Sequence, residues 1–191
     1  MSQKKLPKFL DEWEREALLK QPNPRYWTGQ RNKILIRLML KTGLRLSEVV
    51  NLQWQHLNGM NGRVMVREGK GAKDRTVWID DKTIALLLDW RERQTERTGK
   101  QEYVFTTFKG DPLQPRYIQQ MLERYSDKAG IRHVHPHLLR HSFAVEFLEA
   151  GGNIRSLQLL LGHSDLSTTQ IYLQISDQHV KEDLHEVQNR W

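Results

Sequence analysis

The chain has 191 residues, with 30 lysines and arginines against 23 aspartates and glutamates, and its formal net charge is +7. That length suits one domain, or one domain with a short appendage. The complete lack of cysteine excludes disulfide bonds, a thiolate nucleophile and zinc sites built on cysteine. The positive charge fits a polyanionic partner such as nucleic acid, although many ordinary domains are basic too.

No stretch of the sequence has the composition of a membrane segment. The first residues turn acidic too early to hold the apolar part of a signal peptide. The longest nearly apolar run, residues 34–40, contains Arg37 and is far too short to cross a bilayer. We therefore expect a cytoplasmic protein without a membrane-spanning segment.

The first third of the chain reads as helical. Residues 11–20 begin with acidic side chains and end with a lysine, which complements a helix dipole. From Gln30 to Thr42 apolar residues recur at helical spacing, and Gly43 is a plausible stop. Ser47 is expected to cap a short helix that runs to Leu52.

In the middle of the chain, the spacing of the apolar residues changes from helical to alternating. Residues 63–67 and 75–79 alternate and are rich in β-branched side chains, which predicts a β-hairpin with a basic, glycine-containing turn. The helical pattern returns at 81–94 and again at 114–129.

Three further helices are expected after residue 135. Pro136 suits the first turn of a helix that runs to Ala150, and Asn153 can cap the next one, which ends at Gly162. A further predicted helix carries Tyr172. The sequence therefore predicts a mainly α fold with a small antiparallel β-sheet (α+β).

Two basic segments could meet a phosphate. Arg45 stands between a helix stop and a helix start, where its planar fork can bind an anion with two hydrogen bonds. The hairpin turn carries Lys70, Lys73 and, at its end, Arg75; Lys73 could also deliver a proton to a leaving oxygen. In isolation, the interpretation as a solvated surface group is favoured for each of the two segments.

A histidine-rich segment precedes the helix that starts near residue 136. His137 and Arg140 are three residues apart and share a helix face, so both can reach one anion. His137 and His141 also have the i, i+4 spacing of zinc ligands, but Leu138 stands where zinc peptidases of that pattern have glutamate. We therefore expect no metal site.

The last candidates are His163 and Tyr172. A tyrosine hydroxyl, with a reference pKa of about 10, is a poor nucleophile until a base and nearby cations assist it. A lone tyrosine on a helix is more often part of the core. The order of these groups along the chain is more informative than any one of them.

Taken in order, these segments resemble the tyrosine recombinase (phage integrase) family over roughly residues 9–175. The resemblance rests on TGLRLSE (42–48), GKGAKDR (69–75), HPHLLRHSFA (135–144) and LGHSDLSTTQIY (161–172). It implies the fold of the family's catalytic domain and a catalytic set of Arg45, Lys73, His137, Arg140, His163 and Tyr172. It further implies that Glu48 supports this set, and that Lys70, Arg75 and His141 contact DNA.

The activity implied by the resemblance is site-specific cutting and rejoining of DNA through a 3′-phosphotyrosyl intermediate at Tyr172. Arg45 and Arg140 would stabilise the negative charge that develops on the phosphate, and Lys73 would protonate the leaving 5′ oxygen. His163 would add a hydrogen bond, and His137 would assist proton movement. Neither a metal, ATP nor a cofactor is expected.

The implied partner is double-stranded DNA with specific recombination sites. We expect a homo-oligomer, tetrameric in the synaptic complex and a monomer or weak dimer when free, near the nucleoid of a prokaryotic or viral host cell. Residues 1–175 are assigned to the catalytic domain, with the family's N-terminal core-binding domain absent, so DNA binding should be weak and salt-sensitive. Residues 176–191 are expected to form a helical tail, packed in cis or exchanged between subunits.

Three other functions are alternatives to a site-specific recombinase. A type IB topoisomerase or a telomere-resolving enzyme would share the nucleophile and the chemistry. A DNA-binding regulator on the same fold would have lost the chemistry, which the complete residue set disfavours. A metal-dependent transposase is disfavoured because no suitable set of acidic residues is present.

Overall fold

The computed structural model describes residues 8–67 and 74–162, and within those ranges it is mostly helical with one small antiparallel sheet. This confirms the predicted fold class. In chain order the elements are α1 (Glu12–Lys20), α2 (Trp27–Thr42), α3 (Leu46–Val50), the 3₁₀ turn η1 (Trp54–His56), β1 (Leu57–Asn58), β2 (Arg63–Val66), β3 (Arg75–Trp78), α4 (Asp81–Thr98), α5 (Pro115–Ala129), α6 (Pro136–Glu149) and α7 (Ile154–Leu161).

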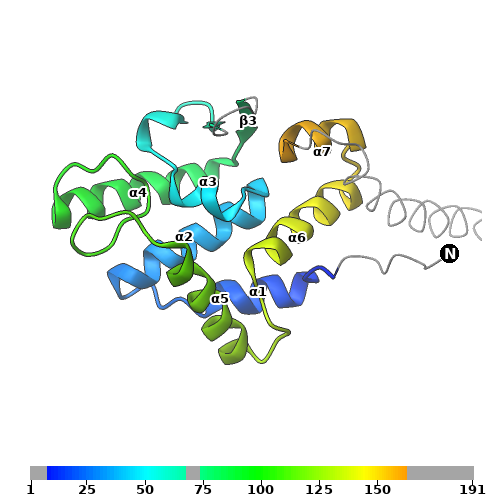
Figure 1. Ribbon diagram of the computed structural model, residues 1–191, viewed down its shortest axis with the longest axis horizontal. Coiled ribbons are helices and arrows are strands. Elements are labelled where there is room, and N and C mark those ends of the chain that lie inside the picture. The colour runs from blue at the N-terminus through cyan, green and yellow to red at the C-terminus, as the bar shows by residue number, and fades with distance from the viewer. Residues whose placement is uncertain (1–7, 68–73, 163–191) are drawn as a thin grey trace, which may run out of the picture.

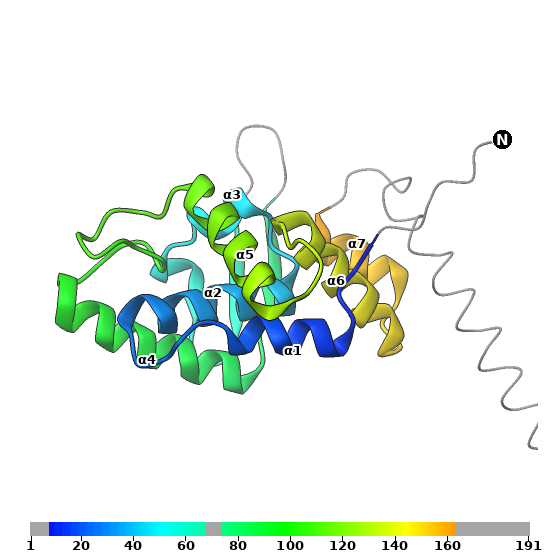
Figure 2. The ribbon, with the colours of Figure 1, turned by 90° about the horizontal axis from the view of Figure 1, so that it is seen from below.

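Helix α2 is the centre of the fold. It packs against α4 and α6, and Figure 1 shows it between these two helices. Most of its apolar side chains are buried, although they point in several directions: Ile34, Leu35, Ile36, Leu38, Met39 and Leu40. A helix that is apolar on most sides is stable only when neighbours cover it. In the second view α1 and α4 lie toward one face of the molecule and α3 toward the opposite face (Figure 2).

The sheet has the strand order β1-β2-β3, with antiparallel pairing throughout. Val64 pairs with Val77, and both side chains are buried. The two predicted strands are confirmed, ending one residue earlier than expected. Strand β1, which pairs Leu57 with Val64, was not predicted because two residues are too few to show an alternating pattern.

Several predicted helix ends are confirmed by their caps. Asp11 accepts a hydrogen bond from the backbone N–H of Glu14 (2.8 Å), and the Glu14 carboxylate accepts one from that of Asp11 (3.1 Å). Asn153 caps α7 with a single hydrogen bond, which its Oδ1 accepts from the Arg155 N–H (2.8 Å), and Gly43 ends α2 with a left-handed φ of 63°.

The predicted cap of α3 is wrong. Arg45, not Ser47, is the N-cap residue, and the carboxylate that completes the cap comes from Glu48. Helix α2 begins at Trp27 instead of Gln30, because the Trp27 ring packs on Trp90 at 4.6 Å and extends the helix. Helix α4 continues past residue 94 to Thr98 through polar residues that carry no apolar period.

A second, smaller apolar cluster joins α6 and α7. Its buried members are Phe143, Ala144, Val145, Leu157 and Leu161, and Phe9 packs against it. This cluster fixes α7 against the end of α6, next to the site described below. No helix in the described ranges is both long and apolar enough to cross a bilayer. The helix predicted around Tyr172 and the tail at 176–191 lie outside the described residues.

Candidate active site

A pocket of about 290 Å³ brings together three of the predicted catalytic residues, Arg45, His137 and Arg140. It opens between the start of α3, helix α5 and the start of α6. The rest of its lining consists of Leu46, Gln119, Glu123, His133, Val134, His135 and Pro136. The other predicted catalytic residues, Lys73, His163 and Tyr172, lie outside the described residues, as does Lys70.

Arg45 is fixed at the start of α3 by both its backbone and its side chain. Its backbone N–H donates to Glu48 Oε2 (2.7 Å), and its Nη1 donates to Glu48 Oε1 (3.1 Å). Its Nη2 donates to the carbonyl oxygen of Gly162 (3.2 Å). Because the side chain remains 36% exposed, its guanidinium is oriented by protein groups and still reachable from solvent.

Arg140 is buried and ties together the ends of two helices. Its Nη1 donates to the carbonyl of Gly43 at the end of α2 (2.7 Å). Its Nη2 donates to the carbonyl of Leu161 at the end of α7 (2.6 Å). The terminal carbonyls of a helix lack intrahelical donors and carry partial negative charge, so a guanidinium suits this place.

Glu48 and Arg75 form a buried ion pair behind Arg45, with side chains 6% and 7% exposed. Arg75 donates from Nη1 to Glu48 Oε1 (2.7 Å) and from Nη2 to Oε2 (2.8 Å). Its Nε donates to the carbonyl of Leu160 (2.7 Å). Burial raises the pKa of Glu48, but the hydrogen bonds and charges of Arg75 and Arg45 outweigh it and keep that pKa below its usual value.

The position of Arg75 differs from the exposed DNA contact that the sequence indicated. Its guanidinium faces the protein interior, and the hydrogen bonds above go to a carboxylate and a backbone carbonyl. The reason is that β3, in which Arg75 pairs with Val66, packs against α7 and brings Arg75 within hydrogen-bond distance of Glu48 on α3. This placement favours a supporting role over contact with DNA.

Three arginines from three different elements converge on the end of α7. Each donates to one of three successive carbonyls: Arg75 to Leu160, Arg140 to Leu161 and Arg45 to Gly162. Gly162 ends the helix with a left-handed φ of 64°, and His163 is the next residue in sequence. The helix end that orients these arginines therefore leads directly into a predicted catalytic residue. Sequence reasoning missed this arrangement; its only signal was the glycine stop.

Histidines form one wall of the pocket. The ring centroids of His133 and His135 are 6.2 Å apart, and those of His135 and His137 are 6.5 Å apart. Burial, and then the neighbouring histidines, lower the pKa of His135, whose Nδ1 accepts a hydrogen bond from the Leu138 N–H (3.3 Å). In the described ranges no three histidine, aspartate or glutamate side chains gather as a metal ion would require.

His141, predicted to contact DNA, follows Arg140 on α6 and is partly buried. Burial lowers its pKa, and the charges of His137 and Arg140 add to that effect. A neutral imidazole is therefore favoured at this position near neutral pH.

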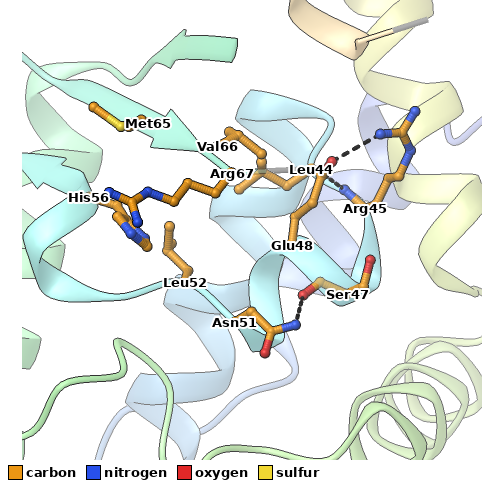
Figure 3. Close-up of a pocket in the computed structure, with 10 residues that line it drawn as sticks. All are labelled: Leu44, Arg45, Ser47, Glu48, Asn51, Leu52, His56, Met65, Val66 and Arg67. Atoms are coloured by element: carbon orange, nitrogen blue, oxygen red, sulfur yellow. Dashed lines mark hydrogen bonds and ion pairs between the residues drawn. The ribbon is translucent and has the colours of Figure 1, made fainter. Parts of the chain in front are cut away.

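Arg45 also lines a second cavity, of about 460 Å³. In Figure 3 the Arg45 side chain lies at one end of this cavity, whereas His56 and Arg67 lie at the other. Asn51 and Ser47 line its floor, where Asn51 Nδ2 donates to the Ser47 carbonyl (2.8 Å). Arg45 therefore faces both cavities, in a setting rich in hydrogen-bond donors.

Gly43 is required for this geometry, and we expect Gly43→Ala to destabilise the fold. A Cβ would lie 2.4 Å from Phe143 Cδ1 and 2.9 Å from Leu161 Cδ2, at a φ of +63°. The left-handed backbone costs about 1–2 kcal/mol, and the overpacking adds about 1–3 kcal/mol. Gly130→Ala is the matched control, because φ is +65° and nothing lies within 4 Å. Equal losses of unfolding free energy in urea for the two variants would contradict the packing argument.

The chain matches a known protein family over most of its length. The model of the phage integrase family matches residues 8–179. The chain belongs to the phage integrase family. This phage integrase domain is 40% identical over 183 residues to the tyrosine recombinase XerA of Pyrococcus furiosus, covering 94% of the chain and 61% of that relative. It thus spans about three-fifths of the length of this relative.

Solved structures of the same family agree with the fold of this phage integrase domain. The crystal structure of XerA recombinase superimposes with a TM-score of 0.83 at 29% identity, covering 96% of the chain and 66% of XerA. XerH site-specific recombinase, in a post-cleavage complex with palindromic difH substrate, gives 0.80 at 30% identity, covering 94% and 53%. The fold predicted from the family resemblance is therefore confirmed.

Proposed function

We propose that this chain is the catalytic part of a site-specific tyrosine recombinase that cuts and rejoins DNA strands, with Tyr172 as its nucleophile. The convergence of Arg45, Arg140 and His137 on one pocket supports this proposal most strongly. Two guanidiniums held in place by backbone carbonyls suit the charge that develops on a phosphate during transesterification.

In the proposed reaction the Tyr172 hydroxyl oxygen attacks the phosphorus of a phosphodiester in line with the 5′ oxygen. A phosphotyrosyl bond forms to the 3′ phosphate, and the bond to the 5′ oxygen breaks. Lys73 gives that oxygen its proton, while His137 assists removal of the tyrosine proton. Rejoining reverses these steps with a 5′-hydroxyl as nucleophile, and it needs neither ATP nor a metal because one phosphodiester replaces another.

Arg45 and Arg140 are proposed to bind the non-bridging phosphate oxygens, with His163 as a further donor. A guanidinium carries five N–H donors, so one that is oriented by carbonyls can still meet an anion. Because those carbonyls fix both guanidiniums beforehand, little reorganisation is needed when charge develops on the phosphate. Glu48 is proposed to support Arg45, in line with their two hydrogen bonds.

The proposed partner is double-stranded DNA that carries specific recombination sites. The XerH structure is a complex with its difH substrate, which supports a partner of this class. We propose a tetramer in the synaptic complex and a monomer or weak dimer when free, acting in the cytoplasm.

Residues 1–175 would form the catalytic domain, with Lys70 and His141 near DNA, and 176–191 a tail packed in cis or in trans.

A covalent-trapping assay tests the proposal. Duplexes of randomised sequence, each with a nick that lets the cleaved end diffuse away, are incubated with the protein in EDTA. We expect an adduct that survives SDS and retains a label at the 5′ end of the cut strand, because the protein stays on the 3′ phosphate. Loss of the adduct in EDTA, or its absence across the whole library, would contradict the proposal.

A further inference from the structure

The family resemblance gave catalytic roles to Arg45 and Arg140 but none to Arg75, the third arginine at the end of α7. It contacts two other elements at once: both oxygens of Glu48 on α3 and the Leu160 carbonyl on α7. A guanidinium that binds a carboxylate with two parallel hydrogen bonds fixes the orientation of that carboxylate as well as its place. No other basic residue type has this geometry.

We propose, building on the function above, that Arg75 is a positioning residue which holds Glu48 against the end of α7 and through Glu48 orients Arg45. The contacts form one continuous path. Arg75 binds Glu48, and Glu48 binds both the backbone N–H and the guanidinium of Arg45. Arg75 itself has a side chain only 7% exposed, so it acts on the phosphate through these neighbours.

The same anchor fixes the end of the hairpin. Arg75 is the first residue of β3 and pairs with Val66, the last residue of β2. Lys73, the proposed proton donor, stands two residues before it in the sequence. The contacts of Arg75 therefore connect β3, the strand that follows Lys73, to α3 and α7. Helix α3 begins next to Arg45, and α7 leads into His163.

The charge of Glu48 makes this role measurable. Among the described residues, the charged or titratable groups around Glu48 are Arg45 at the start of α3 and Arg75 on β3, with Arg67 after β2 and His56 of η1 lining the same cavity. Burial alone would favour the protonated carboxyl. An ionised Glu48 supports Arg45 at every pH above its lowered pKa, and this support is lost as the pH falls through that value. Removal of Arg75 should move this loss to higher pH.

The decisive variant is Arg75→Gln, followed by two readouts. We expect the acidic limb of the pH profile of adduct formation to move up by about 1–3 pH units, as for loss of a cation beside a carboxylate. Glutamate labelled with ¹³C at the carboxyl, assigned by the signal missing in Glu48→Gln, should show the same shift in the Glu48 titration without DNA. In Arg75→Gln/Glu48→Gln the acidic limb should no longer follow this titration, because the titrating group is gone.

Two further variants distinguish the proposed positioning role from a general loss of structure. Arg75→Lys keeps a charge but not the paired hydrogen bonds, so Glu48 should stay ionised while the rate falls. Arg37→Gln removes an arginine that bridges α2 to Asp80 (2.9 Å) elsewhere in the fold, and it should leave the pH profile unchanged.

A uniform rate loss in Arg75→Gln, with an unshifted Glu48 titration, would overturn the inference and leave Arg75 a merely structural residue. A wild-type protein without any adduct would instead contradict the proposed function, whereas the DNA-free titration would still decide whether Arg75 controls Glu48.

Discussion

Replacement of Arg140 by glutamine is expected to slow adduct formation by about 100–1,000-fold, the usual cost of losing one fixed donor to a developing negative charge. Arg140 is one of the two arginines that line the proposed phosphate pocket, and carbonyls at both ends of its guanidinium fix its direction. The rate is measured on trapped DNA at a temperature where the variant is folded.

The same variant should also be less stable. Glutamine is too short to reach both carbonyls, and a buried polar group left without its partner costs about 1–3 kcal/mol. Arg140→Lys keeps the charge but cannot bridge Gly43 and Leu161, so it should recover part of the rate and little of the unfolding free energy. A glutamine variant that cleaves DNA within ten-fold of the wild-type rate would rule out the proposed role of Arg140.

Tyr172→Phe is expected to remove adduct formation altogether. Loss of a catalytic nucleophile lowers rates on the order of 10⁶-fold, and phenylalanine has no oxygen with which to form a phosphotyrosyl bond. DNA binding should be retained, because only one hydroxyl is removed. Tyr26→Phe is the matched control, since Tyr26 is 67% exposed before the start of α2 and away from the pocket.

Adduct formation is measured by gel shift in SDS for both variants over the same series of DNA concentrations. An adduct that persists in Tyr172→Phe, or one that also disappears in Tyr26→Phe, would mean that the nucleophile has been assigned wrongly.

Much of the fold could be predicted from local sequence signals. The capping residues Asp11 and Asn153 and the stops Gly43 and Gly162 mark helix ends through short-range hydrogen bonds and backbone conformation, which a sequence displays directly. The hairpin strands followed from their alternation. The family resemblance also placed Arg45, His137 and Arg140 in one predicted site, and in the structure all three line one pocket.

The partners of the arginines could not be predicted in the same way. Arg75 donates to Leu160, 85 positions further along the chain, and Arg140 donates to Gly43, 97 positions back. Such contacts depend on the packing of α7 against β3 and of α6 against α2, which no local pattern contains. For the same reason a basic residue at the end of a hairpin turn reads as exposed, although Arg75 points inward.

The cap of α3 shows a related limit. Ser47 has the stronger intrinsic preference for a cap, but Glu48 can reach back to the Arg45 N–H only if the helix begins two residues earlier. The ion pair with Arg75 keeps the Glu48 carboxylate in that position. Tertiary contacts therefore determine whether Arg45 or Ser47 is the N-cap residue of α3.

The identity of the residue joined to DNA is the most direct test of this account. The trapped adduct is digested with nuclease and trypsin, and the peptide that carries a nucleotide is identified by mass spectrometry. We predict the peptide 156–181, in which Tyr172 is the only tyrosine, with the nucleotide on that side chain. A nucleotide on any other residue would contradict the proposed nucleophile and the mechanism built on it.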